Sequence, residues 1–494
     1  MRIRTVSTFP GKHTVQIVSK YYGKLIIHKH IGTYATEEEK QNLLKEAHLY
    51  IKEKTGQENL FDPPQSLRLE NVIITQSRPM FLYRLLCRIY EKLGFNQYPD
   101  TLVRDLIVAR IYKPSSKRET REILLDLFGI NYSLLTVYRH LKTAIDNGLK
   151  DQFQTALINF AQNGLNDSLR LVFYDVTTLA FDSQTKAGLK DFGFSKDHRF
   201  QDVQVVVGLV VNRDGFPLYF DVFNGKTFEG KTFISVIQNI KSLLKNPNLV
   251  VIADAAMISR INIEELDKRN IGFIVGARLA NLSVTLQDKI SGEVSGQDQK
   301  ITTANYLNHR LICQYLTKRA AKDRSDREKQ TVKASSVVSS PSKISYRFRF
   351  VKTINGRYEV NNALIEKTKK LEGIKGYLTN TDLDENSIIE RYHDLWRIEK
   401  SFRITKSDLE ARPVFLRLDK TITCHLIIVF AGLAICRYLE LKIHLSIQKI
   451  LKVAEKVLTH KATNVQTGEI KFIETTILDK KLKEKIELLN SLGH

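Results

Sequence analysis

The sequence is poor in cysteine, and the cysteines it has are scattered. They are Cys87, Cys313, Cys424 and Cys436. No two of them form the closely spaced pair that a zinc module requires, and their spacing does not suggest a disulfide framework. We therefore expect a cytoplasmic protein, held together by a packed core in a reducing compartment.

Signals for secretion and for membrane insertion are also missing. The stretch MRIRTVSTFPGKHTVQIV at positions 1–18 has no continuous apolar run of signal-peptide type. The most apolar later stretch, Leu426 to Cys436, is too short to span a bilayer and is interpreted as a core helix. No membrane partner is therefore expected.

Positive charge is what the sequence has in excess. Lys and Arg number 76 against 54 Asp and Glu, which gives a formal net charge of +22 in 494 residues. With 43% hydrophobic residues, a chain of this length predicts two or three packed domains. The cationic excess favours nucleic acid as the partner. The alternative is a basic protein whose charge serves only its solubility.

The pattern of strand-like and helical segments divides the chain into three regions. Residues 1–166 begin with strand-like runs and continue mainly as helices, which we interpret as a DNA-binding region. Residues 167–445 alternate strands and helices, which predicts a mixed α/β domain. An irregular basic stretch at about 279–377 is predicted to be a β-rich insertion with one loop, or alternatively a solvated linker. Residues 446–494 form a mainly helical C-terminal tail region.

Two helices in the first region are similar to a helix-turn-helix. Ser116 and Glu119 form a capping box that begins the first helix, and Gly129 ends it. The apolar face expected on the second helix consists of Leu134, Leu135, Tyr138 and Leu141. Arg139 and Lys142 then point outward, as in a reader of the DNA major groove. An ordinary helical hairpin is the alternative.

Two acidic residues stand within apolar runs of the central region. Asp175 lies in LVFYDVTTLAFD, and Asp254 ends VVIAD. A lone buried carboxylate is unfavourable, so each acid needs a partner. These runs are expected to be neighbouring strands of one sheet, where two carboxylates can share Mg²⁺ or Mn²⁺. The alternative is that each acid only caps a strand end.

A third acid, Glu399, is predicted on a helix packed against that sheet. The segment SIIERYHDLWRIEKSFRITKSDL has an apolar stripe made of Ile388, Leu395, Ile398, Phe402 and Leu409. The residues beside this stripe are Tyr392, Trp396, Glu399, Arg403 and Lys406. Glu399 is thus placed to reach the metal, with Tyr392, Arg403 and Lys406 on the same side to hold phosphate. Alternatively, Glu399 is solvated and pairs with Arg403.

Several strings of the sequence occur together in a recognisable order. They are YDVTTLAF, GFSKDHR, VIADAAM, GYLTN and YHDLWRIEKSFRITKSDLEARPVF. In this order they resemble the DDE transposases of bacterial insertion sequences, in the group named for its YREK motif. The resemblance runs from about Leu169 to Glu440, and KYYGKLIIHKHIGTYATEEE near the start is similar as well. It implies an RNase H-like catalytic core that a β-rich insertion interrupts before the last acid.

The resemblance also implies roles for single residues. The catalytic and metal-binding triad falls on Asp175, Asp254 and Glu399, and the Tyr and Lys of the signature fall on Tyr392 and Lys406.

One signature position departs from the group. The signature Arg falls on Leu395. Either Arg397 or Arg403 supplies the missing phosphate contact, or that contact is absent. The Gly-Asn usual after the third strand is replaced by Gly225-Lys226, a smaller departure.

The activity that the resemblance implies is DNA transposition. The protein would bind terminal inverted repeats as a homodimer, cleave the transposon ends and join the 3′-ends to target DNA by phosphoryl transfer with two Mg²⁺ or Mn²⁺ ions. No nucleotide cofactor is expected, because transesterification exchanges one phosphodiester for another. Lys196 and Arg199 are further candidates for phosphate contacts. Trp396 either stacks on an unpaired base or belongs to the core.

Two other functions remain open from the sequence. One is a metal-dependent RNase H-like nuclease that cuts DNA without joining strands. The other is a DNA-binding relic without catalytic activity, against which the three intact acids argue.

Overall fold

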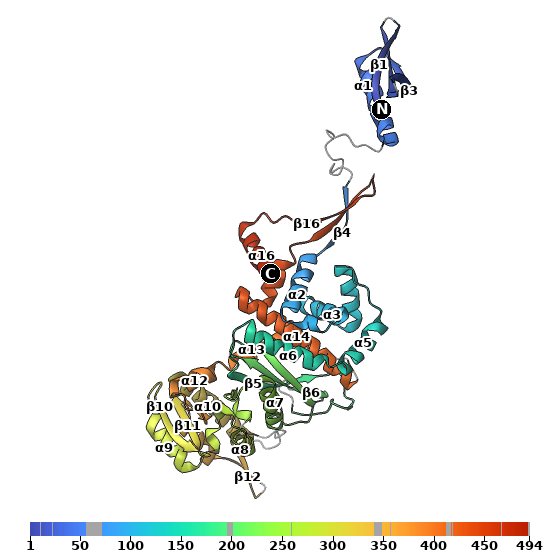
Figure 1. The fold of residues 1–494 in the computed structure, drawn as a ribbon. Coiled ribbons are helices and arrows are strands. Elements are labelled where there is room, and N and C mark those ends of the chain that lie inside the picture. The colour runs from blue at the N-terminus through green and yellow to red at the C-terminus, as the bar shows by residue number, and fades with distance from the viewer. Residues whose placement is uncertain are drawn as a thin grey trace. The chain divides into compact units, whose positions relative to one another are not determined.

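The computed structural model describes residues 1–9, 11–21, 23–55, 72–194, 201–257, 259–339, 348–355, 357–411, 416, 418–465 and 467–492. The chain forms two compact units (Figure 1). The smaller unit contains residues 1–76 and 461–472, and the larger contains residues 77–460 and 473–494.

The smaller unit is a three-stranded antiparallel sheet with one helix. Strands β1 (Arg2–Phe9), β2 (Lys12–Tyr21) and β3 (Lys24–Tyr34) pair in chain order. Helix α1 (Glu37–Thr55) covers one face, and the core between them contains Val15 and Ile17 of β2. The strand-rich start predicted from the sequence is therefore confirmed.

A second small sheet contains β4 (Val72–Arg78), β15 (Thr459–Asn464) and β16 (Ile470–Glu474), in the order β16-β15-β4.

Five helices open the larger unit. They are α2 to α6, at Met80–Lys92, Thr101–Tyr112, Lys117–Ile123, Leu134–Asp146 and Leu149–Asn163. Ser116 caps α4 as predicted, because its hydroxyl accepts a hydrogen bond from the Glu119 backbone N–H at 3.2 Å, which is one of the two bonds of a capping box. Gly129 ends the turn after α4 with φ of 76°, a conformation that favours glycine.

The buried face of α5 differs from the prediction. The residues it buries are Val137, Leu141 and Ala144, at spacings of four and three, whereas Leu135 and Tyr138 are 58% and 41% exposed. Helix α5 packs against α3 and α14, which select that stripe. Arg139 and Lys142 are exposed, as predicted.

The centre of the larger unit is an eight-stranded mixed sheet in the order β10-β11-β14-β9-β8-β5-β6-β7. Its first five strands in the chain are β5 to β9, at Leu171–Ala180, Gln204–Asn212, Pro217–Asn224, Val250–Ala253 and Gly272–Ala277. β5, β8 and β9 run parallel, while β6 and β7 form an antiparallel hairpin. The mixed α/β class is confirmed.

Helices flank this sheet (Figure 1). Helix α7 (Glu229–Leu244) packs on β6 and β7 and also against α8 (Arg260–Lys268). Tyr174 of β5 points toward α7, because its hydroxyl lies 2.6 Å from that of Thr232. The next residue, Asp175, points to the other face, since side chains alternate along a strand.

The segment between β9 and β14 is not simply β-rich, so that prediction is wrong in part. Strands β10 (Ile301–Tyr306), β11 (His309–Tyr315) and β14 (Ile374–Thr379) extend the central sheet. The other elements are α9 (Val284–Val294), α10 (Thr317–Ser339), β12 (Val351–Ile354), β13 (Arg357–Val360) and α11 (Asn362–Lys370).

Part of the basic stretch that was predicted to be β-rich is instead helix α10. Only Ala320, Ala334 and Val337 of this helix are buried, so it has no apolar stripe to find in the sequence. Charge pairing supports it instead, including Arg327 with Glu372 at 2.5 Å, both of which are largely buried.

The predicted single helix at 387–409 is broken. It consists of α12 (Glu385–His393), α13 (Trp396–Arg403) and a wider π-type turn at Ile404–Asp408. The predicted apolar stripe is nevertheless buried throughout.

The C-terminal helices are α14 (Asp419–Ile443), α15 (Ile447–Ala454) and α16 (Lys480–Ser491). In the described part of the chain, α14 alone is long and apolar enough to cross a membrane. The apolar stretch from Leu426 to Cys436, judged too short to span a bilayer, is therefore part of a longer helix. Its apolar window is 94% buried within the protein, as expected for the predicted core helix.

Candidate active site

Asp175 and Asp254 lie side by side on the central sheet. In the parallel pair of β5 and β8, Tyr174 is opposite Ala253, so the two acids occupy the next matching positions. Asp175 is half-buried and Asp254 is exposed where β8 ends. Each carboxylate accepts a 2.7 Å hydrogen bond from the backbone N–H of the following residue. The prediction that these acids stand on neighbouring strands is confirmed.

Tyr392 of α12 binds one of these acids. Its hydroxyl donates to Asp254 Oδ1 at 3.3 Å, and its side chain is only 6% exposed. Burial, together with the negative charge of Asp254, raises the pKa of Tyr392 well above its ordinary value. The hydroxyl therefore stays protonated and remains a hydrogen-bond donor at neutral pH.

Gly276 of β9 makes room for this contact. A Cβ at this position would lie 2.4 Å from the Tyr392 hydroxyl oxygen and 3.2 Å from the backbone nitrogen of Ala255. Only glycine lets the tyrosine reach Asp254, so this position matters for the site although it carries no side chain.

Lys375 of β14 brings a cation to the same place. Its Nζ lies 4.8 Å from the centre of the Tyr392 ring. Burial is the main cause that lowers the pKa of Lys375, while the charges of Asp254 and Glu399 act in the opposite direction. The Lys375 ammonium therefore interacts electrostatically with Asp254 and with Glu399. No sequence pattern points to Lys375, because a single lysine within an apolar strand gives no distinctive signal.

Glu399 is exposed on α13, the helix that packs against β5 and β6. Across the residues that the structure describes, no three His, Cys, Asp or Glu side chains lie close enough together to hold a metal ion. The structure thus pairs Asp175 with Asp254, and the described residues do not assemble a three-ligand site with Glu399.

The donor set fits a hard divalent cation in part. Two carboxylates on adjacent parallel strands offer the oxygen-only ligands that Mg²⁺ and Mn²⁺ prefer. The charge of Glu399 acts on the Lys375 ammonium, as the charge of Asp254 does.

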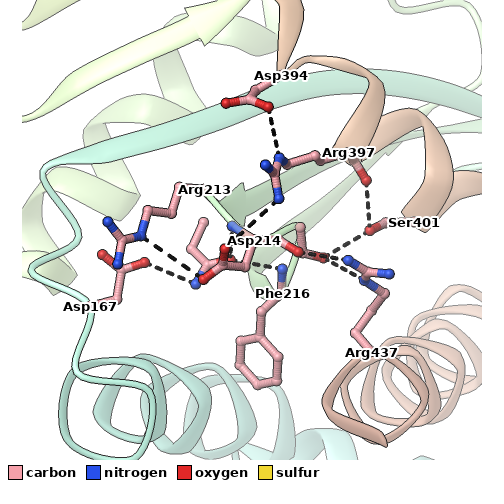
Figure 2. Close-up of polar contacts among 10 residues, drawn as sticks. Asp167, Arg213, Asp214, Phe216, Asp394, Arg397, Ser401 and Arg437 are labelled. Carbon is pink, nitrogen blue, oxygen red and sulfur yellow. Dashed lines mark hydrogen bonds and ion pairs between the residues drawn. The ribbon is translucent and has the colours of Figure 1, made fainter. Parts of the chain in front are cut away.

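The signature position occupied by Leu395 faces the core. Leu395 is 9% exposed, so a side chain at this position packs inside instead of contacting phosphate. Arg397 is held by Asp394 at 2.9 Å and lies 3.8 Å from Asp214, as Figure 2 shows. It therefore points to the β6–β7 turn.

The other predicted DNA contacts of this region have different surroundings. Arg403 is exposed and Lys406 is half-buried in the π-type turn. Trp396 is 53% exposed, so it is not a core residue. Lys196 and Arg199 lie outside the described residues.

A polar clamp holds α13 against the sheet (Figure 2). The buried Ser401 hydroxyl donates to the Gly215 carbonyl at 2.9 Å. Arg437 of α14 is 4% exposed and donates to the same carbonyl at 3.2 Å and to the Asp214 carbonyl at 2.6 Å. These hydrogen bonds anchor both α13 and α14 to the β6–β7 turn. Helix α13 also carries Glu399.

Glu440 completes this clamp from α14. Its carboxylate accepts from Arg437 at 2.8 Å, from Lys400 at 2.7 Å and from the Ile447 backbone N–H at 3.0 Å. Because Glu440 is 7% exposed, these three donors replace the water that would otherwise bind its carboxylate.

Arg437→Ala should lower the free energy of unfolding by about 3 kcal/mol or more, because the substitution leaves buried carbonyls and the Glu440 carboxylate short of partners. Chemical denaturation followed by circular dichroism measures this loss. Arg213→Ala is the matched control, since Arg213 is 62% exposed in the same turn, and should change stability by less than about 0.5 kcal/mol. Equal stabilities of the two variants would show that the clamp contributes nothing.

Residues 225–232, GKTFEGKT, match the phosphate-binding pattern GxxxxGK[ST], although no nucleotide cofactor is expected. The structure does not support a nucleotide site there. The Thr232 hydroxyl is buried, where it donates to the Glu229 carbonyl at 2.6 Å and contacts Tyr174. Strand β7 is also an antiparallel edge strand, not the central parallel strand of such a fold.

Asp175, Asp254 and Glu399 all lie within a region of the chain that one family model matches. The family model for the transposase DDE domain matches residues 167–435, more than half of the chain. The protein belongs to the DDE transposases and is a polynucleotidyl transferase of that family. Members of the family generally use a divalent metal.

Two solved structures are similar to the chain at low identity. A piggyBac transposase synaptic complex with hairpin DNA is 8% identical, with 86% of this chain and 87% of that chain covered and a TM-score of 0.41. A pre-cleavage Mos1 transpososome is 10% identical, with 32% and 72% covered and a TM-score of 0.16. No curated protein matches the chain significantly.

Proposed function

We propose that this transposase mobilises a bacterial insertion sequence of the YREK group, by cleaving the ends of the element and joining their 3′-ends to target DNA. The observation that carries the proposal is the register of β5 and β8, which sets Asp175 beside Asp254. Asp175, Asp254 and Glu399 are the catalytic acids. The mixed sheet with acids on two central strands supports an RNase H-like core at residues 167–445.

The three acids would hold the divalent cation from different structural elements. Asp175, fixed mid-strand, is the rigid ligand, whereas Glu399 approaches from α13. Two bound Mg²⁺ or Mn²⁺ ions would activate the attacking oxygen and stabilise the leaving oxygen. Tyr392 orients Asp254 through its 3.3 Å hydrogen bond, so that the carboxylate keeps one position during successive steps.

Cations around the acids position the DNA backbone. Arg403 takes the role of the missing signature Arg, because it is exposed, whereas Arg397 is occupied by Asp394 and Asp214. Lys406 and Lys375 add positive charge near the scissile phosphate. The exposed indole of Trp396 is available to stack on an unpaired base.

The remaining parts of the chain bind and pair the DNA. We assign residues 1–166, with the exposed Arg139 and Lys142 of α5, to recognition of terminal repeats, and residues 446–494 to a C-terminal tail region. Lys196 and Arg199 remain candidate phosphate contacts. Two copies act on two ends as a homodimer, without a nucleotide cofactor, in the cytoplasm and at the nucleoid.

Incubation with duplexes that carry the DNA flanking the gene tests this function. In Mg²⁺ the protein should produce both nicked ends and joined strands, and chelation of Mg²⁺ should remove both products. Nicks without joined strands would replace the proposal with the nuclease alternative. DNA binding without either product would favour a catalytically inactive relic.

Gly276→Ala should slow DNA cleavage about tenfold or more while the protein remains folded. The added Cβ displaces the Tyr392 hydroxyl, and one lost hydrogen bond to a charged group is worth about 1.5–3 kcal/mol. Cleavage rates of a labelled duplex measure the effect. Gly292→Ala is the control, because a Cβ there meets nothing within 4 Å. An unchanged rate for Gly276→Ala would remove Tyr392 from the site.

A further inference from the structure

The charges of the smaller unit are segregated between its sheet and its helix. Residues 1–34, which form the three strands, contain six Lys and Arg and no Asp or Glu. All five carboxylates of residues 1–55 belong to α1. The three strands therefore contain basic but no acidic side chains. Within residues 1–55, the acidic side chains all belong to the helix that covers one face of the sheet.

The strand register shows which side chains lie on the face away from α1. Ile3 of β1 and Lys29 of β3 flank Ile17 of the core, and Lys29 Nζ lies 4.6 Å from the Tyr50 ring of α1, so this row faces the helix. The neighbouring rows face the opposite way. They are Arg2-Val18-Ile27, Arg4-Gln16-His30 and Val6-Thr14-Thr33, with Lys20 beside Leu25.

Side-chain contacts agree with this assignment of the outer face. Gln16 Nε2 lies 3.3 Å from His30 Nδ1, and the hydroxyls of Thr14 and Thr33 lie 3.1 Å apart. On this face the side chains of the middle strand, β2, are buried between those of β1 and β3. Gln16, for example, is only 8% exposed. The side chains that a partner meets therefore come from β1, β3 and the end of β2.

These outer side chains combine cations with apolar and polar groups. Arg2, Arg4, Lys20 and His30 are exposed. Ile27 and Leu25 are 47% and 37% exposed on the same face. Lys and Arg bind phosphates, while aliphatic groups contact thymine methyl groups at base edges.

We infer that the outer face of the β1-β2-β3 sheet docks on double-stranded DNA, in the major groove. Strands serve as readers in several DNA-binding folds, and the major groove is wide enough to admit them. The inference rests on the proposed function for the identity of the partner, but it concerns a surface far in the sequence from the catalytic acids. It makes this sheet, alongside α5, a DNA-binding element of the chain.

DNA binding by the full-length protein tests the inference without any catalysis. Fluorescence anisotropy of a labelled DNA duplex is measured over a series of KCl concentrations in the absence of divalent metal. One variant carries Arg2→Gln, Arg4→Gln and Lys20→Gln on the outer face. The matched control carries Lys40→Gln, Lys45→Gln and Lys54→Gln on α1, and so loses the same charge.

The outer-face variant should bind more weakly, and its plot of log affinity against log salt should be shallower by about 2–3, because each lost phosphate contact removes about 0.9 from the slope. The α1 variant should keep the wild-type slope. Wild-type affinity in the outer-face variant, or equal losses in both variants, would overturn the inference.

Two further outcomes separate this surface from other possibilities. Equal binding of a duplex RNA would contradict docking in the major groove, because that groove is too narrow in A-form RNA. If the outer-face variant loses binding while the wild type yields no cleaved product in Mg²⁺, the surface stands and the proposed catalytic function fails. If the variant binds normally while the wild type cleaves and joins DNA, the proposed catalytic function stands and the docking surface is wrong.

Discussion

Glu399→Gln should reduce cleavage of transposon-end DNA by about a thousandfold or more, while the affinity for DNA stays within a factor of two of wild type. Loss of one charged metal ligand removes several kcal/mol of transition-state stabilisation, and each 1.4 kcal/mol is about a factor of ten in rate. The substitution is nearly isosteric. It therefore leaves the packing of α13 and the clamp on the β6–β7 turn intact.

Glu390→Gln is the matched control for this prediction. Glu390 is also an exposed glutamate, one helix earlier on α12, and no role at the site is assigned to it. Its cleavage rate should equal that of the wild type. Comparable rates for Glu399→Gln and the wild type would mean that the third acid lies elsewhere, and would leave only Asp175 and Asp254 assigned.

The second large effect is on stability and comes from a buried lysine. Lys117 of α4 is 7% exposed, and burial lowers its pKa to about 7, helped by the nearby charge of Arg110. Arg110 and His425 are also buried, at 6% and 5% exposed. In the unfolded chain Lys117 returns to an ordinary pKa near 10.5.

This shift gives stability a definite dependence on pH. Between pH 7 and about 10 the unfolded chain binds a proton at Lys117 that the folded chain does not, so the free energy of unfolding rises with pH. The slope is at most about 1.4 kcal/mol per pH unit. Below pH 7 both states are protonated, and the folded protein carries the full cost of the buried charge.

Lys117→Met should therefore raise the free energy of unfolding at pH 7 by about 1–4 kcal/mol and flatten its rise toward pH 9. Denaturation curves at several pH values measure both effects. Lys142→Met, at an exposed position of α5, is the control and should leave the pH dependence unchanged. A wild-type slope in Lys117→Met would assign the pH dependence to other groups.

Part of the candidate site could be predicted from the sequence because its signals are local. An acid inside an apolar run, as at Asp175, is conspicuous, and the parallel register of β5 and β8 then places Asp254 beside it. The stripe of 387–409 likewise predicted the buried face correctly. The break between α12 and α13 was not apparent, since no Gly or Pro marks it.

Other features depend on long-range contacts that no local pattern contains. Lys375 enters the site only because β14 pairs with β9, more than ninety residues earlier. Arg437 acts through a turn at Gly215, and its sequence neighbours are merely apolar. Helix α10 was missed for a different reason, because a helix stabilised by charge pairs lacks the apolar period on which such predictions depend.

Asp175→Asn, assayed on flanking-end duplexes with Mg²⁺, tests the central claim most directly, since this residue is the acid fixed within the sheet. Nicked and joined products are measured for the variant and the wild type at equal DNA occupancy. The account predicts that the wild type forms both products and that the variant binds the DNA but forms neither. Joined strands from Asp175→Asn at the wild-type rate would contradict it.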